Sequence, residues 1–327
     1  MRLRPWLPLI IGVVAIAATL LYWRHWIHEQ RVLEKTQAKA QVAKRSVRRD
    51  RAAHPAPLPD AKHVESAHYA ITTTADAAQT QRVVDAVEAL YVAYGRLFSA
   101  HVAPAAGREK LKLTLYAYRE QFKANNYSMP WAEAYYLRPI CYAYYAKSDR
   151  NPYHWMIHEA THQLNAEVAG FRKAKWIDEG LATYFGTSRL ERGRLIPGAI
   201  DPDTYPVWWL TNAGLTGSLD DDIEAGRWIP IRAIITGRDA PNINSNVNRY
   251  YIQYWSLSHF LFHYENGRYA AAYKRLIAEG GTLEHFEKRI GPADRIEYQW
   301  YRYLQGKIQA MTPTADDDGV TAIVWSQ

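Results

Sequence analysis

The chain has 327 residues, a single cysteine and a formal net charge of +7. Residues 1–51 hold eleven Lys and Arg against three acidic residues, so this segment carries +8 and the remainder is near −1. The folded part therefore lacks the basic face of a nucleic-acid-binding domain, and we expect no nucleic acid partner. Cys141 has no partner for an intrachain disulfide, and its apolar, strand-like surroundings predict a small buried residue instead of a metal ligand.

The N-terminal segment predicts a membrane anchor. Residues 6–23 contain no charge, and a helix of these eighteen residues spans about 27 Å, close to the thickness of a hydrocarbon core. A cleaved signal peptide is the alternative, but Ala15 and Ala17 lie inside the apolar run and not after it. We therefore expect residues 1–23 to form a short tail and an uncleaved, single-pass transmembrane helix.

Residues 24–64 are expected to form a basic stalk with a Pro-rich linker at residues 53–59. The stalk serves either as a solvated spacer or as a contact to anionic lipid head groups. Basic residues after the apolar run favour a cytoplasmic body, whereas a short basic N-terminus before it is typical of exported proteins. We favour an extracytoplasmic, periplasmic body, because long domains translocate largely regardless of charge.

The folded domain is expected over residues 65–311, with its first strand at residues 68–74, beginning at His68. Asp76, followed three residues later by Gln79, predicts a capped helix, and the apolar residues behind it have helical spacing. The next predicted elements are a strand at residues 111–116, a short helix at 119–123, and a hairpin of strands at 131–137 and 140–146.

The most informative stretch is His158-Glu159-x-x-His162. Two histidines four residues apart on a helix lie on the same face, where both imidazoles can bind one zinc ion. Glu159 is placed to accept a proton from water at that ion. The alternative is an ordinary helix with two hydrogen-bonded histidines.

The flanking residues indicate where this helix starts and stops. Asn151 is a good N-cap, Pro152 suits the first helical position, and Gly170 is a plausible end.

A second motif, Trp176-Ile-Asp-Glu179-Gly-Leu-Ala182, follows. The two motifs together resemble those of the gluzincin metallopeptidases, the peptidase MA-like proteins, whose zinc helix precedes a helix with Trp-x-x-Glu-Gly-x-Ala. The resemblance covers residues 68–289 and is closest to small, membrane-anchored bacterial members without an assigned activity. It implies that His158, His162 and Glu179 bind zinc and that Glu159 activates water.

The chain also departs from the family pattern. Sixteen residues separate His162 from Glu179, slightly fewer than in the large aminopeptidases. The chain has no Gly-x-Met-x-Asn segment, which holds the substrate amino terminus in the aminopeptidase branch. The resemblance thus implies a zinc peptidase without implying an aminopeptidase.

The resemblance implies an α+β, zincin-like fold. A small mixed sheet and helices form the upper lobe, the lower lobe is mainly helical, and the zinc helix lies between them. In this fold an edge strand near the metal pairs with the substrate backbone. We expect residues 140–146, or the strand beside them, to fill this role, with a purely structural strand as the alternative.

A hydrogen-bond donor for the reaction's oxyanion is also implied. In the aminopeptidase branch it is a tyrosine just before an apolar helix, and Tyr251 stands at the matching position; a packing tyrosine is the alternative. Asp178 and Thr183 flank Glu179 and are candidates to orient the ligand imidazoles, with helix capping as the alternative for Asp178. The rivals of Tyr251 as donor are Tyr250, Tyr254, His259 and His263.

The C-terminal half begins with residues 187–247, whose Gly, Pro, Asp and Asn predict loops and short helices along one side of a cleft. Three consecutive aspartates at residues 220–222 predict a solvated turn or, alternatively, a calcium site, although they match no EF-hand pattern. Helices are then expected from Tyr250 onward, at residues 269–278, 283–289 and 293–305, before a flexible tail at 312–327.

These features predict a membrane-anchored metalloprotease that hydrolyses peptide bonds, with Zn²⁺ as cofactor and a peptide or protein as substrate. One alternative is an envelope binding or assembly factor that holds zinc on a peptidase fold with little or no catalysis. Another is the same chemistry on a non-protein amide such as a cell-wall peptide. Glu159 favours hydrolysis, because a pure binding protein has no physical need for the base. The sequence leaves the oligomeric state open.

Overall fold

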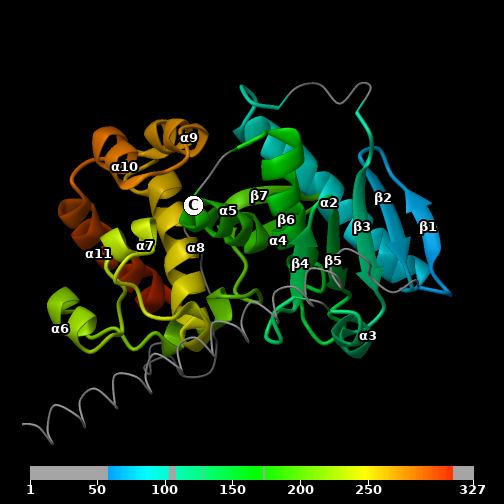
Figure 1. Cartoon of the computed structure of the whole chain (residues 1–327), viewed down its shortest axis with the longest axis horizontal. Helices are drawn as coiled ribbons and strands as arrows, with labels where there is room; N and C mark the ends of the chain where they lie inside the picture. The colour runs from blue at the N-terminus through cyan, green and yellow to red at the C-terminus, as the bar shows by residue number, and fades with distance from the viewer. Residues whose placement is uncertain (1–57, 103–107, 127, 172–173, 312–327) are drawn as a thin grey trace, which may run out of the picture. The chain divides into compact units, whose positions relative to one another are not determined.

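The computed structural model describes residues 58–102, 108–126, 128–171 and 174–311. The chain divides into two compact units. One consists of Met1–Pro57 and Tyr127–Met129, of which only residues 128 and 129 are described. The other, Leu58–Asn126 with Pro130–Gln327, holds every described helix and strand (Figure 1).

The predicted anchor at residues 1–23, most of the predicted stalk and the predicted tail lie outside the described residues. Within the part of the chain that the structure describes, no helix combines the length and the apolar character needed to cross a bilayer.

A five-stranded mixed sheet forms the N-terminal part of the larger unit, in the strand order β1-β2-β3-β5-β4. Strands β2, β3 and β5 run parallel, and the outer strands β1 and β4 are antiparallel to their neighbours. The predicted strands are confirmed, but β1 was missed, and it begins before the predicted domain boundary at residue 65. The strands are β1 (Lys62–Glu65), β2 (Tyr69–Thr73), β3 (Leu111–Tyr116), β4 (Ala134–Leu137) and β5 (Ile140–Tyr144).

The order of the strands decides between two expectations. Residues 140–146, or the strand beside them, were expected to offer a free edge, and β5 lies between β3 and β4 and pairs with both. A strand paired on both sides has no ladder groups left for a peptide. The free edge belongs to β4, the strand beside it, at the end of the sheet.

The two faces of the sheet pack differently because side chains alternate along β5. Cys141 and Ala143 enter the main core, and Cys141 is fully buried as predicted. Tyr142 and Tyr144 enter a smaller cluster with Phe122 of α3 (Arg119–Ala124) on the other side.

Helix α2 (Ala77–Leu97) packs into the main core. It begins where the sequence predicted, because Asp76 and Gln79 form a reciprocal capping box.

Three helices carry the predicted motifs: α4 (His154–Gln163), α5 (Lys175–Gly186) and α8 (Val247–His263). α4 contacts β4 and β5 on one side and α5 on the other, and α5 in turn contacts α8 (Figure 1). A π-helical turn, η1 (Leu164–Val168), continues α4, and Gly170 ends the run at a positive φ of 65°, as predicted.

The predicted start of α4 was wrong. The helix begins at His154, with Tyr153 as its N-cap residue. Asn151 Nδ2 donates to Asp201 Oδ2 at 3.0 Å, and the carbonyl oxygen of Pro152 accepts from the Ala146 amide at 3.1 Å. These two residues therefore connect α4 to other segments and do not cap it.

The stretch between α5 and α8 was expected to hold only loops and short helices. It also contains a hairpin of β6 (Ser188–Glu191) and β7 (Arg194–Ile200), whose turn residues Arg192 and Gly193 both have positive φ. The short helices of this stretch are η2 (Val207–Asn212), α6 (Leu219–Glu224), α7 (Ile231–Thr236) and η3 (Ile243–Ser245). The predicted C-terminal helices are present as α9 (Ala270–Ala278), α10 (Leu283–Arg289) and α11 (Ala293–Met311).

The structure also corrects the predicted environment of the aspartate cluster at residues 220–222. Asp222 lies in α6 and is fully buried, with its carboxylate hydrogen-bonded to the protein. A solvated turn and a calcium site are both wrong for this residue. Its partners Arg227 and Tyr301 explain the burial, because a buried carboxylate needs paired charge and hydrogen-bond donors.

Candidate metal centre

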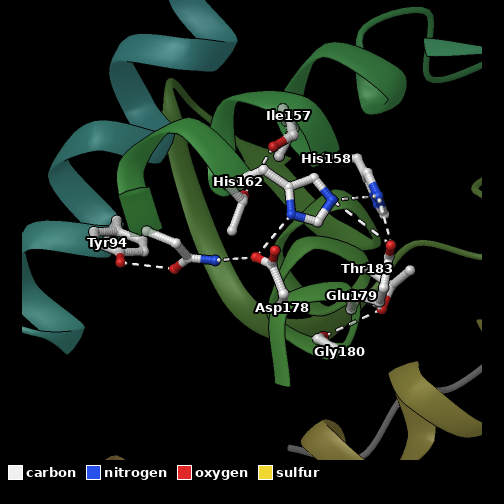
Figure 2. A network of polar contacts seen from close by, with 10 residues as sticks. Tyr94, Ile157, His158, His162, Asp178, Glu179, Gly180 and Thr183 are labelled. Carbon is white, nitrogen blue, oxygen red and sulfur yellow. Dashed lines mark hydrogen bonds and ion pairs between the residues drawn. The ribbon is translucent and has the colours of Figure 1, made fainter. Parts of the chain in front are cut away.

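The three predicted ligands converge at the contact between α4 and α5 (Figure 2). The Nε2 atoms of His158 and His162, one helical turn apart, are separated by 3.2 Å. Glu179 Oε2 lies 3.5 Å from His158 Nε2 and 3.6 Å from His162 Nε2. One ligand atom of each residue lies within 4.8 Å of the others, so the group is close enough to hold a metal ion.

Gly180 lets α5 approach α8 closely. A Cβ at Gly186 of α5, by contrast, would make an ordinary van der Waals contact, 3.4 Å from the Cβ of His158 on α4. A Cβ at Gly180 would overlap Ser258 Oγ and the carbonyl oxygen of Tyr254 on α8. In the Glu-Gly pair of the second motif, the predicted ligand Glu179 is thus followed by the glycine that lets α5 contact α8.

A chain of hydrogen bonds fixes the orientation of His162 (Figure 2). Its Nδ1 lies 2.8 Å from Asp178 Oδ1. An ionised carboxylate only accepts hydrogen bonds, so Nδ1 donates and Nε2 is the ring nitrogen that faces the centre, where it offers a lone pair whenever the ring is neutral. Asn165 Nδ2 donates to the same Asp178 oxygen at 3.1 Å, and the Tyr94 hydroxyl donates to Asn165 Oδ1 at 2.8 Å.

Asn165 and Tyr94 were not predicted as site residues. Asn165 lies in η1 and Tyr94 in α2, seventy-one residues apart in sequence, and no local pattern connects them. Asp178 orients an imidazole and does not cap α5, whose N-cap residue is Ala174. Thr183 does not contact an imidazole through its hydroxyl, which donates to the carbonyl oxygen of Glu179 at 2.6 Å.

The protein groups at the centre favour a positive charge between them. Burial lowers the pKa of His162, but the carboxylates of Asp178 and Glu179 outweigh burial and raise that pKa well above its usual value. Burial raises the pKa of Glu179, but both imidazoles outweigh it and hold that pKa well below its usual value. Glu179 Oε2 is buried and accepts no hydrogen bond from any described residue. Acceptor atoms that face one another in this way fit a bound cation.

Glu159 lies on α4 beside the first ligand and is also buried. Burial raises its pKa, and the neighbouring imidazoles of His158 and His162 offset part of that shift. A carboxylate with a raised pKa is a better proton acceptor than one in water.

Tyr251 of α8 lies at the same centre. Its ring centroid is 6.1 Å from that of His158. Burial, followed by the charges of Glu179 and Glu159, raises the pKa of Tyr251 well above its usual value. The phenol therefore keeps its proton at neutral pH and remains a hydrogen-bond donor.

Three of the rival donors have other hydrogen-bond partners. The Tyr250 hydroxyl donates to the carbonyl oxygen of Pro241 at 2.7 Å. His259 bonds Tyr303 and the Gly198 carbonyl, and His263 bonds Tyr184. The fourth rival, Tyr254, packs its ring 6.1 Å from that of Tyr251.

A packed row of aromatic rings extends from Tyr251. Tyr205 lies 5.5 Å from Tyr251 and 5.5 Å from Trp155, and Trp131 lies 6.4 Å from Tyr251, all between ring centroids. At these spacings the rings contact one another and leave no room for a guest between them. The row therefore forms a wall beside the metal group.

A family described as "Protein of unknown function (DUF1570)" matches residues 154–279. The match begins at the first residue of α4 and ends just after α9, so it includes both histidines, Glu159, Glu179 and Tyr251. No curated protein shows significant similarity to the chain. Over this segment the chain is similar to a family whose function is unknown.

Proposed function

We propose that this protein is a membrane-anchored, zinc-dependent hydrolase of peptide bonds with a gluzincin-type centre. The observation that carries the proposal is the spacing of three acceptor atoms on His158, His162 and Glu179. Ligands about 2.1 Å from a tetrahedral ion are about 3.4 Å apart. The three separations, 3.2, 3.5 and 3.6 Å, are close to this value.

The chemistry of the donor set also supports the proposal. Two imidazoles and one carboxylate are a common set for catalytic zinc, and three protein ligands leave one position for water. A zinc ion held there lowers the pKa of bound water and polarises a carbonyl group.

Two further side chains would carry out the proton transfer and charge stabilisation. Glu159 accepts a proton from the attacking water and passes it to the leaving amine. Tyr251, which keeps its proton, donates a hydrogen bond to the oxyanion that develops on the carbonyl. The free edge of β4 offers main-chain groups to an extended substrate.

The wider architecture follows from the same proposal. The sheet with α2 and α3 would be the upper lobe of a zincin-like fold, and the helices from α8 to α11 the lower lobe, with α4 between them. The anchor at residues 1–23, the stalk at 24–64 and an extracytoplasmic body remain predictions. A binding factor on this fold would need the three ligands but neither Glu159 nor Tyr251.

A comparison of wild-type chain with Glu159→Gln on an unbiased peptide library tests the proposal. We expect cleavage to fall about 10²–10⁴-fold, because the general base is lost, while zinc content stays the same. Glu224→Gln, which changes an exposed glutamate of α6, is the matched control and should cleave normally. Equal cleavage by Glu159→Gln would refute the role of the base. A zinc-loaded wild type that cleaves no peptide would favour the binding factor.

A further inference from the structure

A cavity of about 200 Å³ lies along the N-terminal half of α8, outside the metal group. Buried aliphatic side chains and the buried Trp228 form one part of its lining. The half-exposed Trp209, two arginines and amide side chains form the other part. Cavities that bind whole small molecules measure about 300–1,000 Å³, so this one has room for a single side chain or chain end.

The two arginines of the lining differ in their partners. Arg227 Nε lies 2.6 Å from Oδ1 of the buried Asp222, which balances its charge. Arg249 Nη1 donates to the neutral amide of Asn246 at 2.6 Å. Among the residues that the structure describes, no carboxylate lies within ion-pair distance of Arg249. The cavity therefore holds one positive charge that the described protein groups do not balance.

The amide at the cavity wall adds a second donor. Asn248 Oδ1 accepts a hydrogen bond from the Tyr205 hydroxyl at 3.0 Å. This contact occupies the acceptor of the amide and leaves its Nδ2 to donate. A guanidinium with an amide N–H matches a carboxylate, which only accepts hydrogen bonds.

Tyr205 connects this cavity to the metal group. Its hydroxyl bonds the cavity residue Asn248, and its ring lies 5.5 Å from Tyr251, which in turn lies 6.1 Å from His158. Asn248 and Tyr251 are also three residues apart on α8, about 60° around the helix axis.

We propose that this cavity is a substrate subsite for a carboxylate that lies away from the bond that is cleaved. The substrate class is then a peptide with either an acidic side chain or a free carboxyl terminus that reaches Arg249. The inference that the bound carboxylate belongs to a substrate rests on the proposed peptidase function. Binding of a carboxylate at Arg249 is testable without catalysis.

The first experiment measures binding of glutarate to the full chain by ligand-observed NMR, with neutral glutaramide and inorganic phosphate as comparison probes. We expect glutarate to bind and Arg249→Gln to weaken it about tenfold or more, because a charge-assisted hydrogen bond is lost. Arg238→Gln, an exposed arginine after α7, is the matched control and should bind as wild type does. Equal binding by Arg249→Gln, no binding, or tighter binding of phosphate would overturn the inference.

The second experiment measures cleavage of quenched peptides that differ only by Glu or Gln at each position near the cleaved bond. Each peptide is made with a free and with an amidated carboxyl terminus, which separates the two sources of carboxylate. We expect one position, or the free terminus, to be preferred about tenfold, and Arg249→Gln to bring that ratio near one.

The outcomes separate the two proposals. Glutarate bound through Arg249, with no peptide cleaved, would keep the carboxylate site and remove the peptidase. Peptides cleaved without any acid preference, with no glutarate bound, would keep the peptidase and remove the carboxylate site.

Discussion

Glu179 and Asp222 are two carboxylates with buried oxygen atoms and opposite surroundings. Asp222 accepts hydrogen bonds from Thr216 N and Oγ1, both at 3.0 Å, from Arg227 Nε at 2.6 Å and from the Tyr301 hydroxyl at 2.5 Å. Glu179 Oε2 accepts none from the described residues and faces two imidazole nitrogens. The protein supplies hydrogen-bond donors to Asp222. The buried oxygen of Glu179 faces other acceptor atoms, and a cation or a proton between them is needed to offset their repulsion.

The difference teaches how to separate a structural acid from a candidate metal ligand. Burial alone does not distinguish them, and neither does a cluster of acids in the sequence. The informative quantity is the balance of donors and acceptors around each oxygen. The predictions below test that balance, from the largest expected effect to the smallest.

Tyr251→Phe tests the donor beside the unsatisfied group. We expect kcat for peptide cleavage to fall about 10²–10³-fold with zinc content unchanged, since one oxyanion donor is removed. Tyr250→Phe is the matched control, because that hydroxyl donates to the carbonyl oxygen of Pro241. If the two variants lost the same activity, Tyr251 would be a packing residue only.

Asp222→Asn tests the satisfied carboxylate. We expect the free energy of unfolding to fall by about 3 kcal/mol, because Arg227 loses its buried partner, while zinc binding persists. Chemical denaturation and metal analysis of the same sample measure both quantities. Asp221→Asn, at the exposed neighbouring residue, is the matched control and should alter neither the free energy of unfolding nor the zinc content. Loss of zinc by Asp222→Asn in folded protein would contradict a purely structural role.

The stabilisation of the fold by Asp222 should depend on pH in a defined direction. Burial raises the pKa of Asp222, but the hydrogen bonds from Tyr301 and Arg227 outweigh burial and hold the pKa below its usual value. A lowered folded pKa stabilises the fold above the unfolded value, about 4, and this contribution is lost as the pH falls through the folded pKa. The difference in the free energy of unfolding between wild type and Asp222→Asn should therefore have its full value at pH 6 to 7 and shrink below about pH 4.

Asp178→Asn tests the orientation of a ligand and should have the smallest effect. We expect zinc affinity to fall about 10–100-fold, because the carboxylate that fixes His162 is lost. Competition with a chelator measures the affinity. Thr183→Val is the matched control. Thr183 also lies close to Glu179 in α5, but its hydroxyl donates to helix carbonyl oxygens, so its loss should change zinc affinity little. An unchanged affinity in Asp178→Asn would show that packing alone orients the ring.

The local part of the fold was predictable from sequence. The strand β3 and the capping box of α2 depend on residues close together in the chain, and both were found where expected. Helical spacing likewise put His158 and His162 on one face of a helix, and the resemblance of the second motif implied Glu179 on the next helix.

The parts that sequence missed depend on distant partners. The order of the strands, which makes β4 the edge, has no local signal. The burial of Asp222 depends on Tyr301, seventy-nine residues away, and the support of Asp178 depends on Tyr94 in α2. The hairpin β6–β7 was read as loop because Gly and Pro within it concealed the strand pattern.

The central claim is that His158, His162 and Glu179 hold one zinc ion, and metal analysis of the purified full chain tests it most directly. Wild-type protein should contain one zinc per chain. His158→Ala and Glu179→Ala should each lose it, while circular dichroism shows a retained fold. An unchanged zinc content in both variants, or a wild type that binds no zinc when the metal is supplied, would contradict the account.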